Sequence, residues 1–103
     1  MAKFHIDFKK HIPEVQLAAH AIGLDHKRPY IRCGKSYFRP HRNYFTTPSG
    51  NSDWGYWDEL CTAGLADVEP PGKNMKLWRF WLTRAGLDWL GDTLGITIHD
   101  EED

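Results

Sequence analysis

The chain has 103 residues, of which 41% are hydrophobic and 26% charged, and this composition is typical of one soluble globular domain. No apolar run approaches the roughly 18 residues that a membrane-spanning helix needs, and the N-terminal segment lacks the apolar core of a secretion signal. We therefore expect a single cytoplasmic domain over residues 1–103 that has no membrane partner.

The net charge of −1 conceals a strong segregation of charge along the chain. Residues 26–52 carry six Lys or Arg residues and no acid, whereas residues 53–103 carry four basic and eleven acidic residues. Such a distribution says more about partners than the net charge does. It leaves open whether the basic segment binds an acidic partner or pairs with the acidic C-terminal half of its own chain.

The first residues predict an extended segment followed by one helix. Apolar and polar residues alternate over 4–8, which favours a short strand or an extended arm. Pro13 and Glu14 suit the first turn of a helix, because no hydrogen bond is lost at proline there and an acid complements the positive end of the helix dipole. The apolar stripe that follows predicts a helix over 13–22 that stops at Gly23.

Residues 26–48 form a basic, proline-bearing insertion, and their prolines and glycine exclude one long helix. Aromatic and β-branched residues flank Gly34 and Lys35, so we expect a β-hairpin that turns at this pair. Residues 43–46 are either a further extended piece or a short helix. Residues 47–51 combine Thr, Pro, Ser, Gly and Asn, which predicts a loop.

The following segment predicts a helix and then a β-hairpin. Ser52 or Asp53 is expected to cap a helix over 52–63, with Gly64 just beyond its end. The hairpin that follows consists of a strand over 65–69, a turn over 70–74 and a second strand over 75–82.

The last part of the chain predicts one helix and a short final strand. Thr83 is expected to cap a helix over 84–94 that ends at Gly95, and residues 96–98 suit a strand. We expect His99 and the acidic tail 100–103 to be frayed.

Core packing is the expected role of most of the five tryptophans. Trp57 and Trp89 fall where the second helix, the hairpin and the last helix meet. Trp54, and one of Trp78 and Trp81, are the candidates for exposure.

Two sets of motifs resemble known proteins. AGL (63–65) and LTRAGL (82–87) look like the wing and final helix of winged-helix proteins, while HAIGL (20–24) and RPHRNYF (39–45) resemble small bacteriophage and prophage proteins of unknown role. The resemblance implies an α+β, winged-helix-like fold with about three helices and a small antiparallel sheet. In this comparison the hairpin at about 65–82 is the wing, and the helix before it takes the place of the recognition helix.

The helix over 52–63 departs from that family pattern, because it carries three acids and no Lys or Arg. A phosphate backbone is repelled by such a surface. We therefore expect the basic segment, rather than this helix, to carry any nucleic-acid binding.

The basic segment interleaves cations with aromatic residues, a pattern that suits phosphate contacts together with base stacking. The leading hypothesis is non-catalytic binding, with nucleic acid as the partner. The alternative is a protein-interaction module, such as a host-factor modulator or an assembly component, in which the same segment meets an acidic protein surface. The candidate residues are Arg28, Arg32, Lys35, Arg39 and Arg42 for phosphates, Tyr37 and Tyr44 for stacking, and Lys73 and Lys76 as a basic addition on the wing.

Other chemistry has weaker support in the sequence. The six histidines lack the spacing of zinc sites, so no metal or other cofactor is expected. Cys33 together with one of the histidines would imitate a Cys-His nucleophile pair, but no orienting third group lies at a recognisable spacing. We expect no enzyme activity, and the sequence leaves the oligomeric state open.

Overall fold

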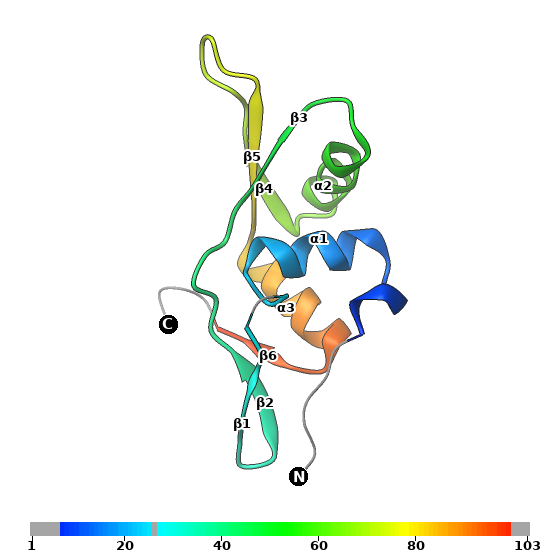
Figure 1. Ribbon diagram of the computed structural model, residues 1–103, viewed down its shortest axis with the longest axis vertical. Coiled ribbons are helices and arrows are strands. Elements are labelled where there is room, and N and C mark those ends of the chain that lie inside the picture. Colours follow the sequence, from blue (N-terminus) through cyan, green and yellow to red (C-terminus); the bar gives the residue numbers. More distant parts are fainter. Residues whose placement is uncertain (1–6, 26, 100–103) are drawn as a thin grey trace.

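The computed structural model describes residues 7–25 and 27–99, and in this part of the chain it is an α+β structure with two three-stranded sheets (Figure 1). The expected α+β class with three α-helices is thereby confirmed. No helix among these residues is both long and apolar enough to cross a bilayer. In chain order the elements are η1 (Phe8–Lys10), α1 (Pro13–Ala21), β1 (Tyr30–Arg32), β2 (Lys35–Phe38), β3 (Phe45–Pro48), α2 (Ser52–Thr62), β4 (Ala66–Glu69), β5 (Leu77–Leu82), α3 (Arg84–Leu94) and β6 (Thr97–Ile98).

The helix α1 confirms the prediction over 13–22 to within one residue. Pro13 lies in its first turn, and the small residues Ala18, Ala19 and Ala21 are buried, so that α2 and α3 both pack against this helix. Gly23 follows its end in the left-handed conformation, as expected of a helix stop.

The predicted N-terminal strand lies only partly within the described residues. Residues 4–6 fall outside them, and Phe8 begins η1, so the strand prediction is wrong for the part that can be compared. The physical reason is local: the Asp7 carboxylate accepts a hydrogen bond from the Lys9 N–H at 3.2 Å, which starts a helical turn.

The first hairpin confirms the expected strands but turns one residue earlier than predicted. Arg32 pairs with Lys35, so Cys33 and Gly34 are the two turn residues, not Gly34 and Lys35. Both have positive φ, 53° at Cys33 and 76° at Gly34. This is the backbone of a type I′ turn, whose twist matches that of two antiparallel strands.

The connection from the first hairpin to β3 is tied to the core by Asn43. Its side-chain amide donates to the Leu82 carbonyl and its side-chain oxygen accepts from the Leu82 N–H, both at 2.9 Å. Asn43 thereby takes the hydrogen-bonding role of a strand residue. Residues 45–48 then form β3, so the loop predicted over 47–51 is wrong at Thr47 and Pro48, which pair with β5.

The second sheet has the order β3-β5-β4, and both of its strand pairs are antiparallel. The helix α2 between β3 and β4 is capped by Asn51 and not by Ser52 or Asp53, because the Asn51 side-chain oxygen accepts from the Trp54 N–H at 2.8 Å. Gly64 lies just past the end of α2 with positive φ, as predicted.

The helix α3 confirms both of its predicted ends. The Thr83 hydroxyl accepts a hydrogen bond from the Gly86 N–H at 3.1 Å, and Gly95 forms the left-handed C-cap. The chain then runs into β6, which pairs with β2 in parallel. The first sheet, in the order β1-β2-β6, is therefore mixed rather than antiparallel throughout.

Aromatic stacking organises the core beneath the second sheet. Trp57 is 0% exposed and stacks between Phe45 and Phe80, with ring centroids 5.7 and 5.6 Å away. Trp54 meets Trp78 edge to face at 5.6 Å, and both are half-buried. The core role predicted for Trp57 is confirmed, and Trp54, Trp78 and Trp81 are partly covered rather than exposed.

The two hairpins project from opposite ends of the molecule. The molecule is elongated, with principal-axis extents of 51 × 30 × 23 Å, and Figure 1 shows the β4–β5 hairpin at the top, the β1–β2 hairpin at the bottom and the helices between them. Basic residues that lie on different hairpins therefore lie far apart.

Candidate functional site

The outer face of the β1-β2-β6 sheet gathers four of the nine predicted binding residues, namely Arg32, Lys35, Tyr37 and Arg39. Tyr30 pairs with Tyr37 and Arg32 with Lys35. Because side chains alternate along a strand, these four lie on one face, while Phe38 and Ile98 point to the core from the other face and are buried. We call this outer surface the basic-aromatic face, and its residues are Tyr30, Arg32, Lys35, Tyr37, Arg39 and His99.

Three rings form a cluster on the basic-aromatic face. The ring centroids of Tyr30 and Tyr37 are 5.7 Å apart, and so are those of Tyr37 and His99. The planes are nearly parallel, at 24° and 9° respectively. The Tyr30 hydroxyl also comes within 3.5 Å of His99 Nε2, which is at the limit of a hydrogen bond.

His99 belongs to this cluster and is not frayed as predicted. Its backbone N–H donates to the Phe38 carbonyl at 2.9 Å, which extends the β2–β6 pairing by one residue. Sequence reasoning missed His99 because the parallel pairing of β2 with β6 joins segments about 60 residues apart. The tail 100–103 lies outside the described residues.

A pocket of about 390 Å³ opens between the rings and the arginines. None of the six residues that line it carries a carboxylate. These lining residues are Tyr30, Arg32, Cys33, Tyr37, Arg39 and His99.

The cations around this pocket are exposed. Arg32, Lys35 and Arg39 have exposed side chains, and so does Arg28, which comes shortly before β1. The ion pairs seen between described residues join His20 to Asp25 at 2.6 Å and Arg84 to Asp88 at 2.8 Å.

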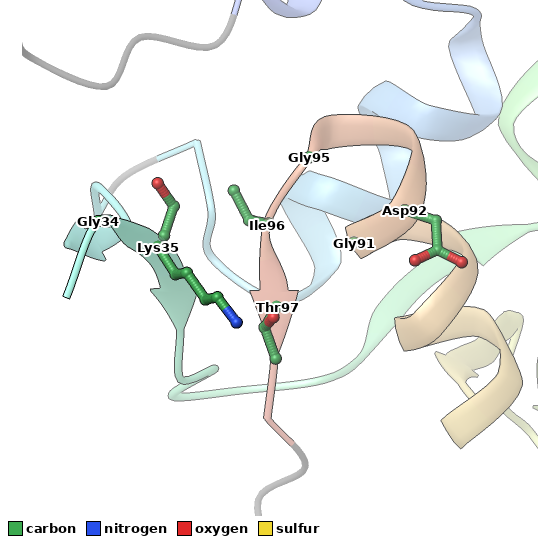
Figure 2. A pocket seen from close by; sticks show the side chains of 8 residues that line it. Gly34, Lys35, Gly91, Asp92, Gly95, Ile96 and Thr97 are labelled. Carbon is green, nitrogen blue, oxygen red and sulfur yellow. The ribbon is translucent and has the colours of Figure 1, made fainter. Parts of the chain in front are cut away.

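A second pocket of about 430 Å³ lies beside Lys35 and differs in its charge. It is bounded by residues 34–36, by the start of β6 and by the C-terminal end of α3, where Asp92 contributes a carboxylate. Figure 2 shows the Lys35 side chain extending from β2 toward Thr97. Asp92 and the negative C-terminal end of α3 oppose the positive charge of Lys35, so the lining of this pocket has no excess of cations.

Arg42 is separated from the basic-aromatic face and takes part in the fold. Its Nη2 donates to the His20 carbonyl at 2.9 Å, near the C-terminal end of α1, and the residue is half-buried. The Gly23 N–H also donates to this carbonyl at 3.1 Å, so the arginine adds a second donor there and complements the negative end of the helix dipole.

Tyr44 also lies on a different surface from Tyr37. The Arg79 guanidinium stands over its ring, 5.2 Å from the centroid. Arg79 belongs to β5 of the second sheet, so Tyr44 is placed beside the wing hairpin and not in the ring cluster.

Lys73 and Lys76 are exposed in the turn between β4 and β5. This turn is at the opposite end of the molecule from the β1–β2 hairpin (Figure 1). The structure therefore does not combine Lys73 and Lys76 with the basic segment into one local patch. Near the wing tip, Met75 and Leu77 are apolar and strongly exposed, at 65% and 48%.

The two cysteines differ in their surroundings. Cys33 is exposed in the hairpin turn and lines the pocket of about 390 Å³. Burial, together with the carboxylates of Asp58 and Asp67, raises the pKa of the Cys61 thiol above its ordinary value. Within residues 7–25 and 27–99 there is no group of three His, Cys, Asp or Glu side chains that could hold a metal ion.

Comparison of the chain with family models, with curated proteins and with solved structures finds no match.

Proposed function

We propose that the protein is a non-catalytic, cytoplasmic nucleic-acid-binding protein that uses the basic-aromatic face. The observation that carries this proposal is a pocket lined by two tyrosines, a histidine and two arginines and by no carboxylate. The β1–β2 register places Tyr30, Arg32 and Tyr37 on the same face, together with Lys35. Cations that bind phosphates displace condensed counterions from the nucleic acid, and aromatic rings stack on nucleobases of any sequence. Both chemistries are present on this face.

The phosphate contacts are proposed for Arg28, Arg32, Lys35 and Arg39, because all four side chains are exposed at the same end of the molecule. Arg42 and Tyr44 are left out, since the first supports the end of α1 and the second packs under Arg79. Lys73 and Lys76 are left out because of their distance from the pocket.

We propose the winged-helix-like half as a scaffold for this face. The order β3-β5-β4, with α2 before the wing and α3 after it, supports this part of the proposal. Asp58 and Glu59 are exposed on α2, so this helix is ill suited to reading a DNA groove. The bacteriophage or prophage origin is proposed from the sequence motifs alone.

The test is a fluorescence-anisotropy titration with labelled DNA and RNA, as single strands and as duplexes, over a range of salt. We expect binding at low salt that weakens as salt rises. The double variant Arg32→Gln, Arg39→Gln should lower the slope of log K against log [salt] by about 1.4 for single strands, at about 0.7 per lost phosphate contact.

The matched control is Lys73→Gln, Lys76→Gln, which removes the same charge from the other end of the molecule. It should bind like the unaltered protein. Absence of any binding at low salt, where non-specific affinity is greatest, would refute the proposal.

A protein-interaction module is the second candidate, and the exposed wing tip favours it. Met75 and Leu77 lie with Pro71 and the Arg79 side chain around a pocket of about 240 Å³. Apolar side chains of this exposure are common in protein contacts. If the protein fails to bind nucleic acid but captures an acidic protein partner, and Leu77→Ser abolishes the capture, this second function replaces the first.

A further inference from the structure

We infer that the pocket on the basic-aromatic face holds an unpaired nucleobase and its phosphate, so that the protein prefers single strands to duplexes. This inference rests on the proposed function and names its substrate class.

The ring cluster suits a nucleobase because its members are already nearly parallel. Tyr37 lies at 24° to Tyr30 and at 9° to His99, and Tyr30 is 46% exposed. A planar base that enters the pocket meets rings held in place by the sheet and by one another. Little conformational freedom is therefore lost on stacking.

The same pocket supplies the partners for the phosphate. The guanidinium groups of Arg32 and Arg39 line it together with the rings. Guanidinium groups bind phosphate through two parallel hydrogen bonds, and they also stack on planar rings. One pocket thus offers stacking for a base and cations for the phosphate attached to it.

The neighbouring pocket of about 430 Å³ is a less suitable site for the anionic strand. Asp92 and the C-terminal end of α3 border it, and both disfavour an anion there. The anionic strand is therefore assigned to the ring side of the hairpin.

A duplex does not satisfy this pocket, because its bases are already paired and stacked. Extracting one base from a duplex costs a few kcal/mol of unpairing and unstacking free energy, whereas the bases of a single strand are already unpaired. The helix that precedes the wing does not compensate by entering a groove, since it exposes Asp58 and Glu59.

The experiment compares three labelled DNA ligands by fluorescence anisotropy: a strand of about 12 nucleotides, within the usual site size, its duplex with the complementary strand, and an abasic strand of equal length. We expect the normal strand to bind about tenfold more tightly than the abasic strand or the duplex, because stacking contributes roughly that much per base.

Two variants test the rings. Tyr37→Leu should remove the preference for the normal strand while the salt dependence remains, because the arginines are unchanged. Tyr30→Leu should have the same effect, and its exposed position makes misfolding a poor explanation for the loss. The control Tyr44→Leu removes a tyrosine outside the cluster and should keep the full preference.

The outcomes separate this inference from the proposed function. Equal affinity for all three ligands overturns the base pocket but leaves nucleic-acid binding in place. Full preference retained in both Tyr30→Leu and Tyr37→Leu also overturns it. No binding to any ligand at low salt overturns both proposals.

Discussion

The substitution Gly86→Ala tests how closely α3 packs against the residues that lead into β4. A Cβ built at this position would stand 1.9 Å from the Leu65 carbonyl oxygen, a backbone atom, and 3.3 Å from the Leu82 Cβ. The Leu65 carbonyl also accepts the Thr83 N–H at 3.1 Å. Gly86→Ala therefore cannot be accommodated by a side-chain rotation, and α3 must move away from the start of β4.

The magnitude follows from these contacts. Overpacking against backbone costs about 1–3 kcal/mol, and weakening the Thr83–Leu65 hydrogen bond adds roughly 1 kcal/mol. Alanine has a higher helix propensity than glycine, and this offsets about 1 kcal/mol of the loss. We expect a net loss of about 1–3 kcal/mol in the free energy of unfolding, which for a domain of this size lowers Tm by roughly 4–20 °C.

Gly55→Ala is the matched control, since Gly55 lies inside α2 and a Cβ there meets nothing within 4 Å. This variant should gain up to about 1 kcal/mol from helix propensity alone. Urea unfolding followed by tryptophan fluorescence and far-UV circular dichroism measures both variants. If Gly86→Ala is as stable as Gly55→Ala, the close approach of α3 to Leu65 is wrong.

Three further predictions follow from individual residues. Asn43→Ala leaves the N–H and C=O of Leu82 without their partners, so it should lower the free energy of unfolding by about 2–3 kcal/mol in the same urea assay; an unchanged midpoint would contradict the role of Asn43 in the sheet. A thiol reagent should modify Cys33 rapidly and Cys61 slowly at neutral pH, because the raised pKa and partial burial of Cys61 leave less accessible thiolate. The slow phase should accelerate as the pH rises. A single fast phase for both thiols would count against this prediction. Removal of residues 100–103, four acids that directly follow His99, should raise the affinity for single-stranded DNA several-fold at low salt and less at high salt; equal affinity with and without the tail would show that these charges do not act on the basic-aromatic face.

The helices were predictable because their signals are local. Pro13, Thr83 and Gly95 act through hydrogen bonds and backbone angles of their immediate neighbours, so α1 and α3 begin and end where the sequence indicates. The cap of α2 was missed by one residue, because Asn51 competes with Ser52 and Asp53 for the same role. Local propensity does not distinguish between adjacent capping residues.

The candidate site was predictable only in part. The basic and aromatic residues of the segment are visible in the sequence, and so is the hairpin that holds them. The sequence does not show which of these residues lie on the basic-aromatic face and which support the fold elsewhere. Arg42 and Arg39 look equivalent in the sequence, yet Arg42 supports the end of α1 and Arg39 lines the pocket beside the rings.

The sequence alone determined the α+β class, the three helices and the segregation of charge, because each depends on residues close together in the chain. The tertiary structure decided which cations share a surface. The register of β1 and β2 places Arg32 and Tyr37 on one face, and the parallel pairing of β2 with β6 brings His99 to them. The same architecture holds the wing lysines at the far end of the molecule. These outcomes depend on contacts between distant segments, which are governed by packing of the whole core and not by local preference.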